Sequence, residues 1–79
     1  MALQVSARNR LPGKVLSVKL GNVMAQIDLQ VDDNHVVAAI TRESALELNL
    51  QEGDEVTAMV KSTDVMVAKA LMEGESYGV

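Results

Sequence analysis

The sequence predicts an all-β domain, a small barrel of short strands with one short helix. Apolar and polar residues alternate along several stretches, which is the period of a strand with one buried face. Between two of these stretches the spacing of apolar residues changes to that of a helix. The chain has 79 residues, of which 48% are hydrophobic, and this length fits one domain with one core.

Four strands are expected in the first half of the chain. LQVSA at 3–7 has the composition of a short strand, and KVLSVKL at 14–20 places alternate apolar residues on one side. Alternation is clearest in VMAQIDLQV at 23–31, where every second side chain is apolar. The polar residues at 32–35 suit a hairpin loop, and VVAAIT at 36–41 follows as the returning strand.

The helix is expected in TRESALELNLQEGDE, residues 41–55. Its apolar residues cluster at helical spacing, Thr41 can cap its start, and Gly53 is expected to end it. EVTAMVKS at 55–62 alternates again, and VMVAK at 65–69 supplies a last short strand. Five or six short strands, with one short helix between the fourth and the fifth, describe a small barrel of the OB type.

The composition also indicates assembly. A domain of this size buries only about 60 to 65% of the surface of its unfolded chain, and the absence of Cys removes disulfides as a source of stability. Both faces of the strand VVAAI are apolar, and Met24, Met59 and Met66 lie opposite the predicted core, where a lone barrel would meet water. Exposed apolar surface of this kind marks a partner contact, so we expect a homo-oligomer.

Charge and hydropathy exclude several classes of function. Seven Lys and Arg against eleven Asp and Glu give a net charge of −4, which disfavours binding to nucleic acid or to an anionic membrane surface. One Tyr with no Phe or Trp leaves no stacking platform for single strands. The apolar runs are too short to cross a membrane and the N-terminus has no signal pattern, so a soluble, cytoplasmic protein is expected.

Neither catalysis nor a bound metal ion is expected. The chain has no Cys, and its single histidine, His35, lies in the predicted hairpin loop beside Asp32 and Asp33. Adjacent residues in a tight polar turn usually share a surface and nothing more. We therefore assign no catalytic residue, no metal ligand and no cofactor.

Three short segments carry hydrogen-bond donors at the ends of predicted elements: SARN at 6–9, TRES at 41–44 and KSTD at 61–64. Their donors, with the N–H groups that begin the helix, suit a small oxyanion. A site with donors only favours a fully deprotonated dianion such as sulfate or molybdate, because the proton of monohydrogen phosphate would lack an acceptor, at a cost of about 1 to 3 kcal/mol. The alternative is that these residues are only caps, turn formers and solvated charges.

The same segments resemble a known family. The chain is similar to the molbindin (Mop) domain over about residues 3–69. The similar stretches are SARN followed by L-x-G-x-V, then VKLGNVMAQI, AAITRESALEL, GDEVTAMVK and STDV. The resemblance implies a Mop domain at 1–69, a flexible C-terminal tail at 70–79, and a hexamer built as a trimer of dimers. It also implies intracellular binding and storage of molybdate, with tungstate as the alternative ligand.

The resemblance places the oxyanion between subunits. The SARN segment of one chain would face the other two segments on its neighbour, so that a monomer owns half a site. The cations near the N-terminus would then be aimed at one buried dianion rather than forming a basic surface. The implied oxyanion-binding residues are Ser6, Ala7, Arg8, Asn9, Thr41, Ser44, Lys61 and Ser62.

Two rival functions stay open. The same domain occurs as a regulatory or accessory module of molybdate transporters and of molybdate-responsive transcription regulators. The start at Met1 and the absence of a helix-turn-helix or P-loop pattern favour a freestanding protein. The second rival is an OB-type nucleic-acid binder, which the negative charge and the lack of aromatic residues disfavour.

Overall fold

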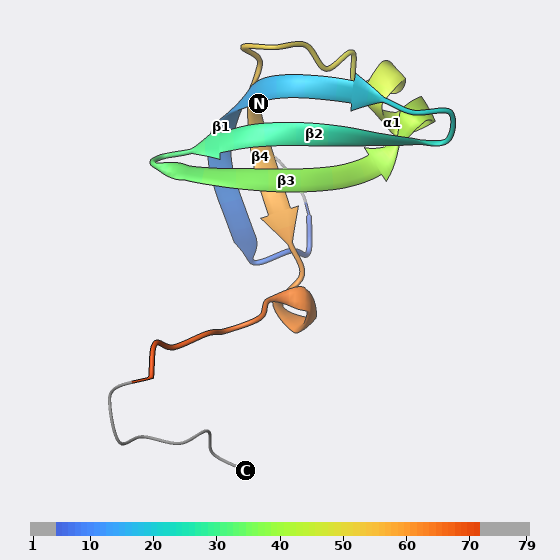
Figure 1. Cartoon of the computed structure of the whole chain (residues 1–79). Coiled ribbons are helices and arrows are strands. Elements are labelled where there is room, and N and C mark those ends of the chain that lie inside the picture. The colour runs from blue at the N-terminus through green and yellow to red at the C-terminus, as the bar shows by residue number, and fades with distance from the viewer. Residues whose placement is uncertain (1–4, 72–79) are drawn as a thin grey trace.

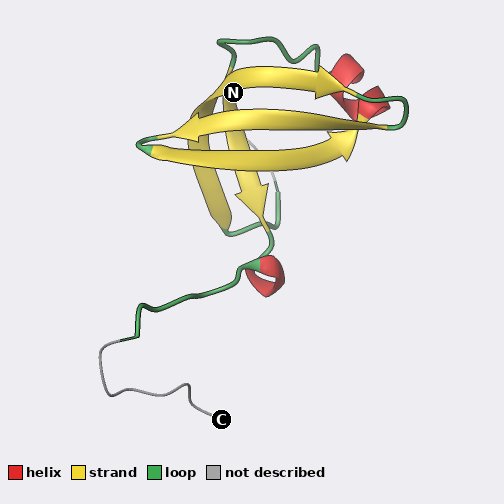
Figure 2. Ribbon diagram, in the orientation of Figure 1, coloured by secondary structure: helices red, strands yellow, loops and turns green. Residues whose placement is uncertain are grey.

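The computed structural model describes residues 5–71. These residues form one antiparallel sheet in the order β3-β2-β1-β4, with one α-helix after β3 and a 3₁₀ turn after β4 (Figures 1 and 2). The predicted all-β class with one short helix is confirmed. The elements are β1 Asn9–Leu20, β2 Met24–Val31, β3 Asn34–Thr41, α1 Arg42–Glu47, β4 Glu55–Val60 and η1 Ser62–Asp64.

The long strand β1 pairs with two strands in turn. Its first half, Asn9–Lys14, pairs with β4, and the remainder pairs with β2. The register with β2 slips between Val15 and Ser17, which marks a β-bulge and bends the strand. At the crossing point a Cβ on Gly13 would stand 2.5 Å from the carbonyl O of Gln30, so this close approach requires glycine. The bend coils the sheet into a partial barrel, with β4 crossing behind β2 and β3 (Figure 1).

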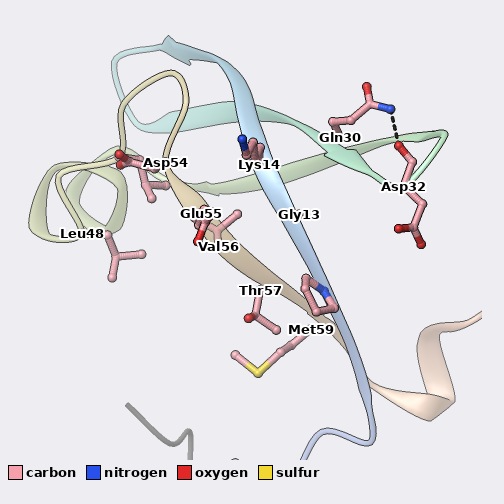
Figure 3. Close-up of a pocket in the computed structure, with 12 residues that line it drawn as sticks. Gly13, Lys14, Gln30, Asp32, Leu48, Asp54, Glu55, Val56, Thr57 and Met59 are labelled. Carbon is pink, nitrogen blue, oxygen red and sulfur yellow. Dashed lines mark hydrogen bonds between the residues drawn. The ribbon is translucent and has the colours of Figure 1, made fainter.

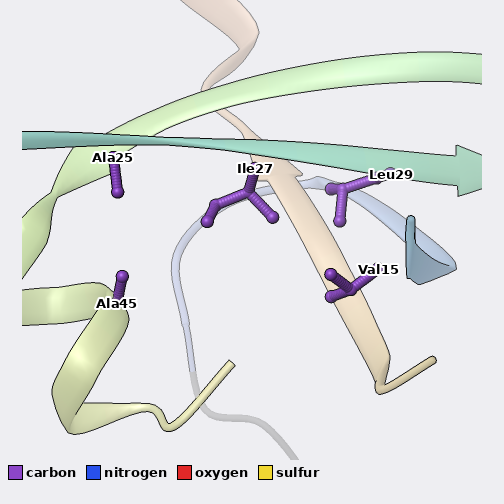
Figure 4. Close-up of a cluster of buried hydrophobic side chains, with 5 residues drawn as sticks. All are labelled: Val15, Ala25, Ile27, Leu29 and Ala45. Atoms are coloured by element: carbon purple, nitrogen blue, oxygen red, sulfur yellow. The ribbon is translucent and has the colours of Figure 1, made fainter. Parts of the chain in front are cut away.

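The core lies on the inner face of this coiled sheet, beneath α1. Alternate residues of β2 supply most of it, as its sequence predicts, and Figure 4 shows Ala45 of α1 facing Ala25 of β2. Val23, which the alternation also placed inside, is 72% exposed because it lies in the turn before β2. The central cluster, in which no side chain is more than 4% exposed, consists of Val15, Ala25, Ile27, Leu29 and Ala45.

The helix is shorter than its apolar spacing predicts. It ends at Glu47, where Asn49 adopts a left-handed φ of 49° and reverses the chain. The N–H of Leu50 donates to the carbonyl of Ala45 at 3.2 Å, and the N–H of Asn49 donates to that of Leu46 at 3.0 Å. This pattern is a Schellman C-cap with Asn in the usual glycine position, so the prediction that Gly53 ends the helix is wrong.

The first and the last of the predicted strands also differ from the structure. The last one, at 65–69, is no strand: Met66 is 94% exposed, and the segment runs away from the sheet after η1 (Figure 1). Residues 5–7 of the predicted first strand, 3–7, are not in a strand, and residues 3–4 lie outside the described residues. Instead, β1 begins at Asn9 and continues through Pro12, which is tolerated because only β4 flanks the strand there.

The β2–β3 hairpin turns on two residues rather than four. Val31 pairs with Asn34, and Asp32 supplies the left-handed conformation, φ 52°, that such a tight turn needs. His35 therefore lies in β3 and not in the loop, so the prediction that it shares a turn with Asp32 and Asp33 is wrong.

Candidate oxyanion site

The structure brings two of the three predicted donor segments together. Asn9, the first residue of β1, pairs with Val60, the last residue of β4, and Asn9 Nδ2 donates to the Val60 carbonyl at 3.2 Å. Lys61 and Ser62 follow Val60 directly and so lie beside SARN of the same chain. The side chains of Ser6, Arg8, Lys61 and Ser62 are all exposed, so their donors are open to a ligand. We name this group the β1/β4 cluster: Ser6, Ala7, Arg8, Asn9, Lys61 and Ser62.

The third segment lies at the opposite end of the sheet. Thr41 ends β3 and pairs with Met24, whose neighbour Ala25 pairs with Leu20, the last residue of β1. Asn9 is the first residue of this 12-residue strand, which at about 3.3 Å per residue would span roughly 36 Å if straight. Figure 1 shows α1 and η1 at different ends of the molecule. One chain therefore does not assemble all eight predicted residues.

Thr41 and Ser44 form a local cap at the start of α1. Thr41 Oγ1 accepts the N–H of Ser44 at 3.0 Å, and the Thr41 hydroxyl donates to Ser44 Oγ at 2.8 Å. The helix has only six residues, so its dipole adds little to an anion site. The Ser44 hydroxyl proton stays available to a ligand. The resemblance groups Lys61 and Ser62 with this pair, whereas within one chain those two residues lie with SARN.

Four carbonyls beside the β1/β4 cluster already accept hydrogen bonds within the chain. A carbonyl oxygen carries partial negative charge and would repel an oxyanion. Arg10, which is not among the predicted site residues, bonds two of these carbonyls, and its only sequence signal is a second cation two residues after Arg8. The carbonyls that each accept a hydrogen bond within the chain are those of Val5, Ala7, Val60 and Lys61.

An open hollow of about 1020 Å³ lies along β1 and β4 (Figure 3), and no residue of the β1/β4 cluster lines it. Its lining includes three acidic side chains, those of Asp32, Asp54 and Glu55, and one cation, Lys14. Because carboxylates repel an anion, this hollow is unsuited to a dianion despite its size.

A second polar cluster lies around Asp28 in β2. This carboxylate is 8% exposed, and it accepts hydrogen bonds from Ser17 Oγ at 2.8 Å and from Gln26 Nε2 at 3.3 Å. His35 Nε2 lies 3.0 Å from Asp28 Oδ1. A Ser–His–Asp relay needs the imidazole between the other two groups, whereas here the carboxylate lies between Ser17 and His35. The arrangement therefore satisfies a buried charge and does not activate a nucleophile.

The Asp28 cluster predicts an acid-dependent loss of stability. The hydrogen bond from Ser17, with those from His35 and Gln26 and the nearby charge of Lys19, lowers the pKa of the Asp28 carboxyl against the opposing effect of burial. A lowered pKa in the folded state stabilises the protein above about pH 4, and this contribution is lost as the pH falls through the folded-state pKa.

We therefore expect Asp28→Asn to be less stable than the wild type at pH 7, with a difference that narrows below about pH 4. Thermal melts from pH 7 to pH 2 measure it. A difference that stays constant over that range would contradict the assignment.

The described part of the chain lacks both a membrane-spanning helix and a cluster of metal ligands. Across residues 5–71, no helix has the length and apolar character needed to cross a bilayer. The same residues hold no group of three or more His, Cys, Asp or Glu side chains placed to share a metal ion.

A coiled antiparallel sheet with a donor cluster at one strand end defines a small β domain suited to binding an anion. Residues 5–67 match the model of the TOBE domain. The chain belongs to the TOBE domain family.

Relatives place it within that family. Molybdenum-pterin-binding protein 2 of Clostridium pasteurianum is 46% identical over 66 residues, covering 82% of this chain and 97% of that protein. A molybdate-binding protein from Sporomusa ovata has a similar solved structure, with a TM-score of 0.81 and 42% identity, covering 85% of this chain and 100% of that one. The cytoplasmic molybdate-binding protein ModG, solved with molybdate bound, gives 0.73 at 39% identity, covering 76% and 43%. The resemblance to molbindin (Mop) proteins is confirmed.

Proposed function

We propose that this protein binds molybdate and serves its storage and homeostasis, with tungstate as the alternative ligand. The observation that carries the proposal is the β1/β4 cluster, where Arg8, Lys61 and two hydroxyls are exposed beside carbonyls that are already bonded. Relatives named for molybdenum or molybdate support the choice of ligand. These relatives are named as binding proteins, and we propose binding rather than catalysis here.

The net charge of the chain does not oppose this function. Each charge-assisted hydrogen bond to a buried dianion contributes about 1.5 to 3 kcal/mol, so a few local donors outweigh a diffuse net charge of −4. Distant surface carboxylates are screened over about 10 Å at ordinary ionic strength. A molybdate ion accepts hydrogen bonds at every oxygen, whereas monohydrogen phosphate brings one proton that needs an acceptor, which the guanidinium of Arg8 and the ammonium of Lys61 do not offer.

In this proposal the site is completed between copies of the chain. The β1/β4 cluster of one protomer faces Thr41 and Ser44 of another, because within one chain these groups lie at opposite ends of the sheet. Exposed apolar side chains support assembly: Met24 and Met59 are 47% and 44% exposed on the outward faces of their strands, and Met66, which lies outside any strand, is 94% exposed. The expected assembly is a hexamer built as a trimer of dimers.

The proposed domain comprises residues 1–69; residues 72–79 of the expected C-terminal tail lie outside the described residues. The match to the TOBE model ends at residue 67, close to the end of the proposed domain. We also propose a cytoplasmic location, which the description of ModG as cytoplasmic supports.

Calorimetric titration with molybdate, sulfate and phosphate, combined with native mass measurement, tests the function. We expect binding of molybdate, little response to phosphate, and a species several times heavier than the 8.5 kDa chain. Absence of molybdate binding would overturn the function. Undiminished binding by a species of monomer mass would overturn only the shared site.

A further inference from the structure

Arg10 ties the SARN segment to the sheet. It is the second residue of β1, where it pairs with Met59 of β4. Its Nε donates to the carbonyl of Ala7 at 3.1 Å, and its Nη2 donates to the carbonyl of Val5 at 2.9 Å. Residues 5–8 belong to no strand, so these two bonds hold a segment that the ladder itself does not hold.

The two bonds have an electrostatic consequence. Val5 and Ala7 flank Ser6, and each of their carbonyls would offer an acceptor next to the predicted ligand. A guanidinium bonded to both oxygens offsets their partial negative charge and takes up one lone pair of each. The segment then offers a ligand the hydroxyl of Ser6 and the guanidinium of Arg8.

We propose that Arg10 is a positioning residue of the oxyanion site. It holds the Val5–Arg8 segment in the shape that presents its donors, and it weakens two carbonyl acceptors that would otherwise be fully available to the proton of a hydrogen phosphate. Arg10 thereby contributes to selection of a fully deprotonated oxyanion without contacting it. This inference rests on the proposed function of the cluster.

The contacts require arginine rather than any cation. The guanidinium is a planar fork that reaches both carbonyls from two of its nitrogens at once, whereas a lysine ammonium is a single point on a flexible stem. We therefore expect Arg10→Lys to keep the local charge while losing one of the two bonds. In that variant the ratio of molybdate to phosphate affinity should fall by a larger factor than the molybdate affinity itself.

Titrations of four variants with molybdate, and with phosphate in competition, test the inference. We expect Arg10→Ala to weaken molybdate binding by about tenfold and to lower the ratio of molybdate to phosphate affinity. Arg10→Lys should recover much of the molybdate affinity but less of the ratio. Arg8→Ala should weaken both anions with the ratio preserved, because it removes a direct donor. Lys19→Ala removes one exposed charge elsewhere and should change neither quantity.

The outcomes separate the inference from the proposed function. If the wild type does not bind molybdate, the proposed function fails and the inference fails with it. If the wild type binds but Arg10→Ala matches it in affinity and in ratio, only the inference is overturned. Native mass and melting temperature identify a variant that does not fold or assemble, and in that case Arg10→Lys decides: an unchanged ratio would overturn the inference.

A measurement on the wild type needs no substitution. In the ¹⁵N-labelled protein, the Nε–H of Arg10 should exchange with water more slowly than that of Arg8, because it is bonded to the Ala7 carbonyl. Equal exchange of the two side chains would overturn the inference.

Discussion

Arg8→Ala and Lys61→Ala each weaken molybdate binding by about 10- to 100-fold, while His35→Ala leaves it unchanged. The size follows from one charge-assisted hydrogen bond, worth about 1.5 to 3 kcal/mol, at about 1.4 kcal/mol for each factor of ten. Both cations are exposed in the β1/β4 cluster, so their removal leaves the core intact. Calorimetry at fixed ionic strength measures the affinities, and native mass shows whether each variant still assembles.

His35→Ala is the matched control because His35 bonds Asp28 in the second polar cluster and belongs to no donor segment. If His35→Ala alone abolished uptake while Arg8→Ala and Lys61→Ala bound normally, the site assignment would be wrong.

Thr41→Val adds a test of the shared site: it removes the hydroxyl and keeps the side-chain shape. We expect it to weaken binding, because Thr41 of one copy is proposed to meet the β1/β4 cluster of another, and the melting temperature shows how much the loss of the α1 cap contributes.

Ile27→Ala lowers the free energy of unfolding by about 2 to 5 kcal/mol, the usual cost of removing a buried aliphatic side chain. Ile27 is 2% exposed at the centre of β2, and it lies in the buried cluster of Figure 4. A domain of this length has a total stability of about 4 to 12 kcal/mol, so the substitution removes a large part of it. Urea denaturation at one fixed protein concentration measures the loss, since assembly makes stability depend on concentration.

Ile27→Val is the graded control and should cost only about 0.5 to 1.5 kcal/mol, because it removes one methylene and leaves a small void. The order of the two variants tests the placement of Ile27 independently of the total stability. A loss below about 1 kcal/mol for Ile27→Ala would contradict a fully buried position.

Local chemistry set the parts of the fold that the sequence predicted well. The alternation in β2 follows from the two-residue period of a strand, and the Thr41 cap follows from a hydroxyl placed before a helix. The predictions that failed concern where elements stop. Asn49 can adopt the left-handed conformation that ends a helix but does not have to, so Gly53 was the stronger signal of a helix end in the sequence.

For the site, residue types alone determined the chemistry: hydroxyl, amide, guanidinium and ammonium donors without a thiol or a metal-ligand set, which favour a small oxyanion. The resemblance to molbindin proteins indicated the ligand, and the sequences and structures of relatives confirm that family. Which donors lie together was decided only by tertiary structure, because the pairing of Asn9 with Val60 joins residues 51 positions apart. The contacts of Arg10 could not be predicted from the sequence either. They depend on the backbone conformation of residues 5–8, which lie outside any strand and so follow no periodic pattern.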